Sequence, residues 1–417
     1  MRFRSKHDIM NRGFYTILAA QFFSALGDNA LLFAAIAMLK TLNAPSWETP
    51  VLQQFFVVSF IVLAPFVGPF SDALPKGQVL FVSNLVKVIG CAAMLIGLHP
   101  LLAYGFVGIG AALYSPAKYG ILTEYLPTNR LVWGNSWMEG LTVAAVILGA
   151  ICGGMLIGPG IEDQLSNQSG WLQDIANVNT AAKFAIFVIL GLYGVAALFN
   201  LYIPKLPIEN KPKARNLGYL LSDFWRCFLL LWKDPLGQVS LAVTSLFWGA
   251  GTTLRFIILT WAASSLELNL EQGTQLTGVV AVGLAIGSVV AAKTISLHHA
   301  VKVLPIGIAM GLVVVGMVFV TDWRPAVAML ILIGALAGSF LIPMNALLQH
   351  RGHLMMGSVH SIALQNFNEN LTIIVMLGAY SAMIQAEFSV NTIVVAFGLF
   401  ISVTMAWLNK RHLHDQD

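Results

Sequence analysis

The sequence predicts an all-α integral membrane protein with twelve transmembrane helices arranged as two six-helix bundles. Hydrophobic residues make up 57% of the 417 positions and charged residues only 10%, whereas about a quarter of the residues of a soluble domain are charged. The charged residues gather between long apolar runs, as expected when ionised side chains avoid hydrocarbon. The second half of the chain also repeats motifs of the first, which is typical of transporters.

The predicted spans are apolar windows of about 20 residues, the length that crosses a hydrocarbon core. They cover residues 14–40, 51–71, 78–98, 100–122, 134–158, 181–203, 237–263, 274–297, 301–320, 325–348, 356–384 and 389–408. The opening segment, Met1–Gly13, is polar and basic, and no small-residue cleavage site follows the first apolar run. We therefore expect the first span to be retained rather than cleaved as a signal peptide.

Basic residues mark one side of the membrane. They occupy the N-terminal segment, every second connection and the C-terminal segment, while the intervening connections carry acidic residues and few cations. The positive-inside rule then predicts that both termini are cytoplasmic. The longest basic connection separates an N-terminal bundle, 1–203, from a C-terminal bundle, 237–417, and residues 204–236 are expected to be a cytoplasmic linker. A solvated basic loop that serves only the membrane topology is enough to explain the basic residues of this linker.

The internal repeat aligns three pairs of spans in the same order. The pairs are Pro116-Ala-Lys-Tyr-Gly-Ile-Leu with Pro343-Met-Asn-Ala-Leu-Leu, Glu139-Gly-Leu-Thr with Glu369-Asn-Leu-Thr, and Phe23-x-x-x-Gly27 with Phe247-x-x-x-Gly251. Each match alone is weak in apolar sequence, but three in register indicate a parallel six-plus-six repeat.

Several ionisable and amide side chains lie inside the predicted spans. A charge at bilayer depth costs about 2.5–3.5 kcal/mol on insertion scales, so each is expected to face a partner, a cavity or water. These side chains are Asp28, Asn29, Lys87, Lys118, Glu139, Arg255, Asn366, Asn368, Glu369 and Asn370. They either pair with one another and hold the bundles in register, or bind a polar headgroup that carries charges of both signs.

The binding interpretation assigns a role to each charge. Arg255 would take a phosphate bidentately, and Asp28 or Glu369 would take an ammonium. Asn29, Asn366 and Asn370 would add neutral hydrogen bonds. Because Gly27 aligns with Gly251, Asp28 and Arg255 are expected to lie one helical turn apart in equivalent spans and to face each other across a central cavity.

Four side chains receive interpretations of their own. Lys87 and Glu124 are expected to lie near the ends of their spans and to reach the membrane interface. Lys118 follows Ser115-Pro116, which is expected to break its helix and expose carbonyl groups to a cavity. Glu139 is expected to share the polar pathway, because it occupies the place of Glu369 in the repeat.

The sequence also argues against several functions. It contains no Walker motif, no Gly-x-Ser-x-Gly elbow and no metal-ligand spacing among its three cysteines or its histidines. We therefore expect a protein that is not an enzyme, with no cofactor, no metal and no nucleic-acid partner.

The segment Gly68-x-x-x-Asp72-x-x-x-Lys76 joins the second and third spans on the predicted cytoplasmic side. It resembles the signature loop of the major facilitator superfamily, which implies the major facilitator fold and a latch that gates the cytoplasmic side. An ordinary turn between spans is the other interpretation of this motif.

Four segments carry a more specific resemblance. They are Phe22-Phe-Ser-Ala-Leu-Gly-Asp-Asn-Ala-Leu-Leu-Phe33, Tyr114-Ser-Pro-Ala-Lys-Tyr-Gly-Ile-Leu122, Ser245-Leu-Phe-Trp-Gly-Ala-Gly-Thr-Thr-Leu-Arg-Phe256 and Pro343-Met-Asn-Ala-Leu-Leu-Gln349. Through them the chain resembles, almost end to end, the bacterial lysophospholipid transporter family, LplT. The loop near Ile161–Val178 looks longer than is usual in that family.

The resemblance implies an inner-membrane carrier, expected to be a monomer surrounded by membrane lipids. It implies movement of lysophosphatidylethanolamine and lysophosphatidylglycerol from the outer to the inner leaflet, where the partner acyltransferase and acyl-ACP synthetase Aas reacylates them. The binding residues it favours are Asp28, Arg255 and Glu369, followed by Lys118, Glu139, Asn29 and Asn366.

The expected mechanism is alternating access by facilitated diffusion, with the acyl tail in a lateral gap between the bundles. One alternative is a proton- or sodium-coupled exporter of amphipathic drugs that uses the same buried carboxylates. Another is a scaffold or sensor that partners an acyltransferase without transporting anything.

Overall fold

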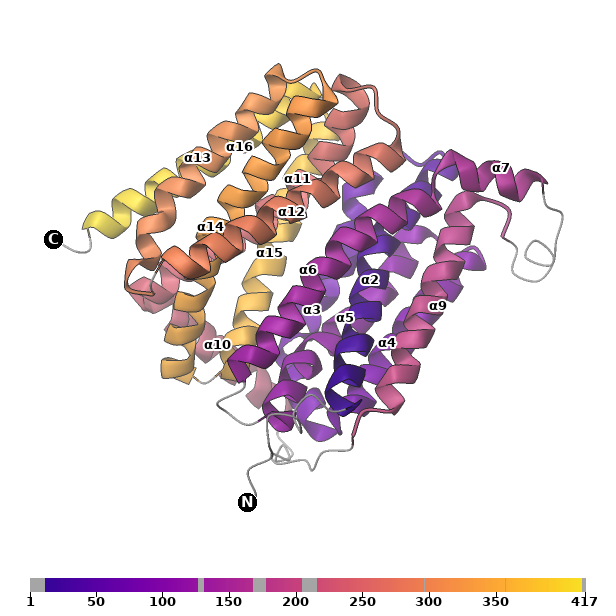
Figure 1. The fold of residues 1–417 in the computed structure, drawn as a ribbon. Coiled ribbons are helices and arrows are strands. Elements are labelled where there is room, and N and C mark those ends of the chain that lie inside the picture. Colours follow the sequence, from indigo (N-terminus) through magenta and orange to yellow (C-terminus); the bar gives the residue numbers. More distant parts are fainter. Residues whose placement is uncertain are drawn as a thin grey trace. The chain divides into compact units, whose positions relative to one another are not determined.

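The chain folds into helices, most of them long (Figure 1). The computed structural model describes residues 12–126, 131–167, 178–204, 216–295, 297–356 and 358–414. The earlier helices are α2 (Arg12–Thr41), α3 (Glu48–Ala73), α4 (Lys76–Leu95), α5 (Pro100–Tyr125), α6 (Leu131–Leu156), α7 (Pro159–Asn167) and α9 (Ala181–Leu201). The later ones are α10 (Leu217–Lys233), α11 (Pro235–Ser265), α12 (Leu270–Thr294), η2 (Leu297–Val303), α13 (Leu304–Gly316), η3 (Met317–Phe319), α14 (Trp323–Met356), α15 (Ser358–Gln385) and α16 (Val390–His414).

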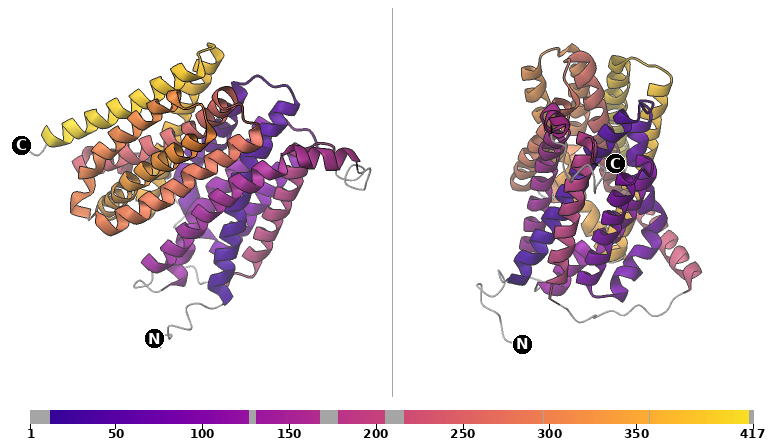
Figure 2. Two further views of the ribbon diagram at one scale, coloured as in Figure 1. Left: turned by 45° about the horizontal axis from the view of Figure 1, so that its top comes forward. Right: turned by 90° about the vertical axis from the view of Figure 1, so that its right-hand side faces the viewer.

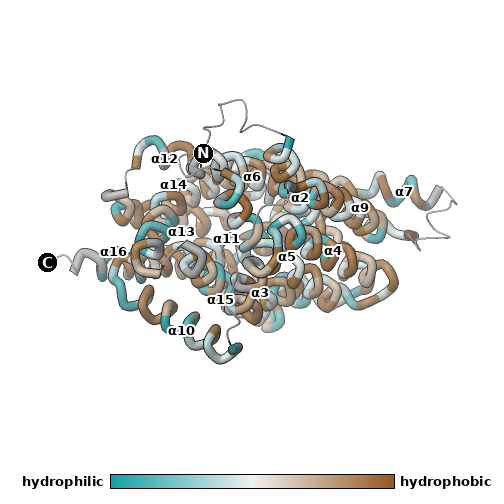
Figure 3. Tube along the Cα trace, turned by 90° about the horizontal axis from the view of Figure 1, so that it is seen from below, coloured by the Kyte–Doolittle hydropathy of each residue, from teal (hydrophilic) through white to brown (hydrophobic). Residues whose placement is uncertain are grey.

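Most of these helices can cross a bilayer. Across the described ranges, eleven are long and apolar enough to do so, and the count is twelve if the bent pair Gly140–Leu156 and Pro159–Leu165 forms one span. Seen from below, the helices carry many hydrophobic residues, drawn in brown, among white and teal ones (Figure 3). The regular elements that the structure describes contain no strand. The predicted all-α membrane fold is confirmed.

Two compact units make up the chain. The first contains Met1–Asn43 and Val58–Leu220, and the second contains Ala44–Val57 and Leu221–Asp417. In the first unit α2 packs against α6 and α9, and α4 packs against α9; in the second α11 packs against α15 and α16, and α13 against α16 (Figures 1 and 2). Because α11, α13, α15 and α16 hold the places of α2, α4, α6 and α9 in chain order, each unit repeats the same internal packing.

The second unit shows how small residues set the helix spacing. α12 packs closely on α14, and a Cβ added at Gly287 would overlap the carbonyl group of Ala335. Backbones can approach this closely only where glycine removes the side chain.

Helix starts follow the local sequence. Thr180 caps α9 by accepting a hydrogen bond from the backbone N–H of Lys183 at 3.3 Å. Asn269 and Gln272 form a reciprocal capping box at the start of α12, with contacts of 2.8 and 3.1 Å. Such caps satisfy backbone N–H groups that have no partner within the helix.

The segment expected to be only a linker contains helix α10. Its inner face buries Cys227 and Leu231 against Leu241, Leu348 and Leu364 of the second unit. The aromatic residues of this stretch explain the difference, because their apolar surface is stabilised when it packs on the ends of neighbouring helices. A solvated basic loop is therefore the wrong description of Leu217–Lys233.

An ion pair fixes the junction between α10 and α11. Asp234 accepts a hydrogen bond from the backbone N–H of Gly237 at 2.7 Å and from Arg351 Nε at 2.9 Å, and a second guanidinium N–H of Arg351 donates to its other oxygen. The hydrogen bond from Arg351 holds the pKa of the Asp234 carboxyl below its usual value, although burial opposes this shift. The pair therefore stabilises the fold fully above about pH 4, and this stabilisation is lost as the pH falls through the lowered pKa.

Candidate functional site

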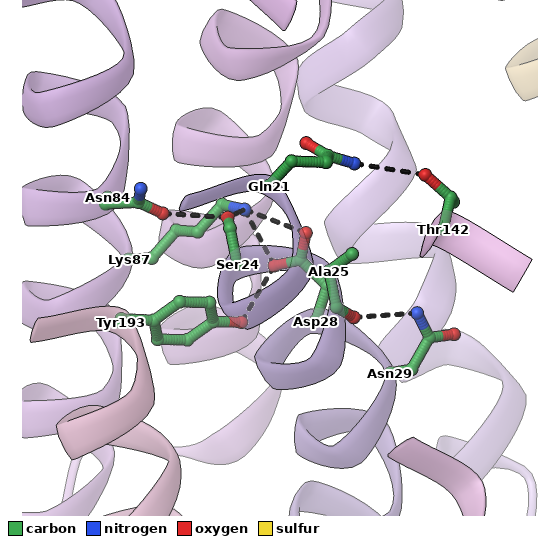
Figure 4. A network of polar contacts seen from close by, with 9 residues as sticks. All are labelled: Gln21, Ser24, Ala25, Asp28, Asn29, Asn84, Lys87, Thr142 and Tyr193. Atoms are coloured by element: carbon green, nitrogen blue, oxygen red, sulfur yellow. Dashed lines mark hydrogen bonds and ion pairs between the residues drawn. The ribbon is translucent and has the colours of Figure 1, made fainter. Parts of the chain in front are cut away.

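A buried polar network surrounds Asp28 in the first unit (Figure 4). Lys87 Nζ donates to both carboxylate oxygens of Asp28 at 2.8 Å and to Ser24 Oγ at 3.0 Å. The hydroxyl of Tyr193 donates to Asp28 Oδ1 at 2.8 Å, and Ser24 donates to Asn84 Oδ1 at 2.8 Å. Helices α2, α4 and α9 therefore each contribute to one cluster inside a membrane-spanning unit.

The interpretation of Lys87 as an interfacial side chain was wrong. Lys87 lies near the middle of α4, and its side chain is 0% exposed, whereas that of Asp28 is 27% exposed. Its ammonium also lies over the rings of Tyr114, at 4.9 Å, and Tyr193, at 5.3 Å. The lysine turns inward because a carboxylate, a hydroxyl and two aromatic faces replace the water that it loses.

Two glycines make room for this network. A Cβ at Gly27 would lie 2.8 Å from Cε1 of Tyr193, and one at Gly110 of α5 would lie 2.7 Å from Cγ of Lys87. Real Cβ atoms do not approach other heavy atoms so closely, so a side chain at either position would displace a partner of Asp28.

Lys118 belongs to a neighbouring polar chain. Its ammonium donates to Thr142 Oγ1 at 3.1 Å, and Gln21 of α2 donates to the same oxygen at 3.2 Å. Lys118 is buried, and α5 continues past Pro116 to Tyr125. The expected helix break was wrong, because proline is tolerated within transmembrane helices whose neighbours satisfy the freed backbone groups.

The second unit has its own buried carboxyl group on α15. Glu369 is 6% exposed, and its Oε1 accepts a hydrogen bond from Gln365 Nε2 at 2.7 Å. The same amide donates to Asn345 Oδ1 of α14 at 2.8 Å. Asn370 donates to the carbonyl oxygen of Asn366 at 2.7 Å.

The remaining predicted binding residues are placed as follows. Asn29 donates to the carbonyl oxygen of Ala25 at 2.8 Å, within its own helix. Arg255 lies half-buried on α11. Glu139 lies on α6, and its side chain is outside the description. Asp28 belongs to the first unit and Arg255 to the second, so their facing across a cavity stays a prediction.

The predicted gating residues lie at the junction of α3 and α4. Gly68 and Asp72 belong to the last turns of α3, where the side chain of Asp72 is outside the description, and Lys76 begins α4. Lys76 is buried, donates to the carbonyl oxygen of Ser71 at 2.7 Å and pairs with Glu124 at 3.5 Å. Glu124 is therefore partly exposed and at the same time forms an ion pair with Lys76 at this junction.

Sequence reasoning missed three members of the network around Asp28: Tyr193, which donates to Asp28, Ser24, which accepts from Lys87, and Asn84, which accepts from Ser24. Tyr193, Ser24 and Asn84 are individually common in apolar helices, and nothing in their spacing along the chain brings them together. Lys87 carried a usable signal, because it lies three residues after Asn84 and near the midpoint of its helix, where a cation cannot reach the interface. Helical spacing of three places both side chains on one face.

These groups suit recognition of a charged, polar ligand. Over the described part of the chain, no group of three or more His, Cys, Asp or Glu side chains could hold a metal ion. Each unit instead presents buried polar side chains inside membrane-spanning helices, which is typical of a substrate pathway.

Comparison with known proteins defines the class. The chain matches the Major Facilitator Superfamily over residues 17–368. A bacterial homologue of the human lysosomal transporter Spinster, solved in an inward-facing and unoccupied conformation, superposes with a TM-score of 0.69 at 13% identity and covers 97% of this chain and 99% of that one. The transporter FucP in its outward conformation gives 0.65 at 13% identity, with 95% and 98% covered. Such low identities concern the fold alone, and together with the family match they define a major facilitator transporter rather than an enzyme.

Closer relatives refine this class. The lysophospholipid transporter LplT of Enterobacter sp. (strain 638) is 39% identical over 406 residues, which is 97% of each chain. The lysophospholipid transporter LplT of Escherichia coli O1:K1 / APEC is also 39% identical, over 97% of this chain and 98% of its own. The chain belongs to the LplT family of the Major Facilitator Superfamily, as its motifs predicted.

Proposed function

We propose that the protein moves lysophospholipids across the bacterial inner membrane, from the outer to the inner leaflet, with lysophosphatidylethanolamine and lysophosphatidylglycerol as substrates. The observation that carries this proposal is the 39% identity, over 97% of the chain, to relatives named as lysophospholipid transporters. The buried polar groups support it, because a lysolipid headgroup needs hydrogen-bonding partners at bilayer depth.

The headgroup in this proposal meets charges of both signs. Arg255 binds the phosphate bidentately, and Asp28 or Glu369 accepts hydrogen bonds from an ammonium or from headgroup hydroxyls. The supporting contacts would come from Asn29, Lys118, Glu139 and Asn366. In favour of this assignment, the side chain of Asp28 keeps 27% of its surface accessible although Lys87 already holds it.

Transport in this proposal proceeds by alternating access. The bundles 1–203 and 237–417, joined by the cytoplasmic linker 204–236, rock about the headgroup while the acyl tail lies in a lateral gap. Gly68, Asp72 and Lys76 gate the cytoplasmic side, on which both termini lie. The protein acts as a monomer, and the acyltransferase and acyl-ACP synthetase Aas consumes the delivered lysolipid, which makes the flow one-way.

Uptake of labelled lysophosphatidylethanolamine into spheroplasts tests the headgroup assignment. Asp28→Ala and Arg255→Ala should each lower the initial rate at least tenfold at equal expression, whereas the exposed Arg324→Ala should leave it unchanged. If Asp28→Ala and Arg255→Ala both show normal uptake, these residues do not bind the headgroup. In cells without Aas, lysolipid uptake should persist while the amount of reacylated product falls. This result would support Aas as the partner.

Glu369 favours a second candidate function, a proton- or sodium-coupled exporter of amphipathic drugs. This carboxyl is nearly inaccessible and is held by a neutral amide, a setting that suits a carboxyl binding and releasing a proton during transport. Drug sensitivity of a deletion strain, without lysolipid accumulation, would favour this function over lysolipid transport.

A further inference from the structure

Lys87 has no role in the headgroup assignment, yet it makes closer contact with Asp28 than any other described cation. We propose that Lys87 is a positioning residue that acts as the tethered counter-ion of Asp28, fixing the carboxylate and taking the place of an exchangeable proton or sodium ion. This inference rests on the proposed role of Asp28 in headgroup binding. It predicts that transport draws on no cation bound at Asp28.

The ammonium of Lys87 is fully coordinated by protein groups. A lysine ammonium has three N–H donors, and three acceptors lie within reach: the two carboxylate oxygens of Asp28, at 2.8 Å, and Ser24 Oγ, at 3.0 Å. Because Ser24 gives its own hydrogen to Asn84, its lone pairs point to the ammonium. The rings of Tyr114 and Tyr193 complete the shell. The ammonium thus has oxygen atoms on one side and aromatic faces on the other. This arrangement resembles a cation site that the ammonium of Lys87 itself occupies.

The carboxylate is oriented by the same contacts. Its Oδ1 accepts from Lys87 and Tyr193, and its Oδ2 accepts from Lys87. A carboxylate offers about four lone-pair positions, so the accessible part of Asp28 retains capacity for one further donor. A headgroup N–H or O–H can use that position, whereas a sodium ion there would lie close to the positive charge of Lys87 and be repelled.

Other groups around Asp28 do not replace this cation. The titratable neighbours are Tyr193 of α9, Tyr114 of α5 and Cys91 of α4, which are neutral when protonated. Lys118 of α5 donates to Thr142 of α6, which also accepts a hydrogen bond from Gln21 of α2. Helix α6 carries the ionisable residue Glu139, of whose side chain the structure gives no description.

The test is the rate of labelled lysophosphatidylethanolamine flipping by the full-length protein in proteoliposomes, at several substrate concentrations, from pH 5.5 to 8.5, with and without sodium. Lys87→Met removes the charge and keeps most of the volume. It should raise the half-saturating concentration at least tenfold and introduce a dependence on pH or sodium that the parent lacks, because an unpaired buried carboxylate takes up a proton or cation. Lys40→Met, an exposed lysine at the end of α2, is the matched control and should behave as the parent.

The outcomes separate the two proposals. Lys87→Met with the parental half-saturation and pH profile, beside an inactive Asp28→Asn, would overturn the role of Lys87 and leave the headgroup role of Asp28 standing. A fully active Asp28→Asn would instead remove the headgroup role. If Lys87→Met does not yield monodisperse protein, Lys87→Arg replaces it in the test. Arginine keeps the positive charge but changes its geometry, so Lys87→Arg should raise the half-saturating concentration without introducing a pH dependence. A half-saturating concentration equal to that of the parent protein would overturn the inference.

Discussion

The ion pair between Asp28 and Lys87 should respond asymmetrically when one partner is removed. Asp28→Asn leaves an ammonium whose side chain is 0% exposed, whereas Lys87→Met leaves a carboxylate that is 27% exposed and still accepts a hydrogen bond from Tyr193. Removing one partner of a fully buried pair costs about 3–5 kcal/mol, of which the two rings facing Lys87 offset about 1 kcal/mol. We expect the free energy of unfolding to fall by about 2–4 kcal/mol in Asp28→Asn.

The loss in Lys87→Met should be about 1–2 kcal/mol, near the cost of leaving a partly solvated group without its partner. Thermal inactivation of the purified protein in one detergent, followed by size-exclusion chromatography, measures the order of the two variants. The double variant Asp28→Asn/Lys87→Met should be more stable than Asp28→Asn alone, because it contains no unpaired buried charge. Equal stability of the single variants, or additive losses in the double variant, would refute the argument from burial.

Three further predictions concern the surroundings of this pair and the α10 junction. Tyr193→Phe deletes the hydroxyl that donates to Asp28 and should lower stability by about 1.5–3 kcal/mol, the usual contribution of a hydrogen bond to a charged group; an unchanged inactivation temperature would contradict this. Gly110→Ala should lower the free energy of unfolding by about 1–3 kcal/mol, because the added Cβ overpacks against α4. The control Gly191→Ala, where an added Cβ meets nothing within 4 Å, should be neutral or slightly stabilising. Equal effects of the two variants would argue against close packing at Gly110. Arg351→Lys should weaken the bidentate contact with Asp234 at the start of α11. Maleimide should then label Cys227, the buried cysteine of α10, faster between pH 6 and 8. A labelling rate equal to that of the parent protein would show that this contact does not hold α10 in place.

The spans were predictable because hydrocarbon imposes a strict rule on sequence. Each helix must hide its own backbone polar groups and must be long and apolar enough to cross, and both properties can be read along the chain. Helix α10 escaped the same reasoning. At 17 residues it is short for a span, and its apolar residues are buried by contact with other helices rather than by lipid alone.

The candidate site was only partly predictable, because sequence shows which charges lie in the membrane and not which partner each one meets. Asp28 was expected to face a cation across the bundles, and the contact that the structure describes is with Lys87 of its own unit. Lys87 was expected to reach the interface although it lies at the middle of its predicted span, 78–98, because its partners on α2 and α9 come from distant parts of the sequence. Pro116 was expected to break α5, since local sequence does not show which neighbours support a proline within a helix.

Flipping of labelled lysophosphatidylethanolamine by the purified protein in proteoliposomes tests the central claim most directly. The label in the outer leaflet is destroyed by an impermeant reductant, and the protected fraction reports movement across the bilayer. Transport predicts that the protected fraction changes at a rate proportional to protein, that unlabelled lysolipid competes, and that Asp28→Ala lowers this rate at least tenfold. A rate equal to that of protein-free liposomes, from monodisperse protein, would contradict lysolipid transport.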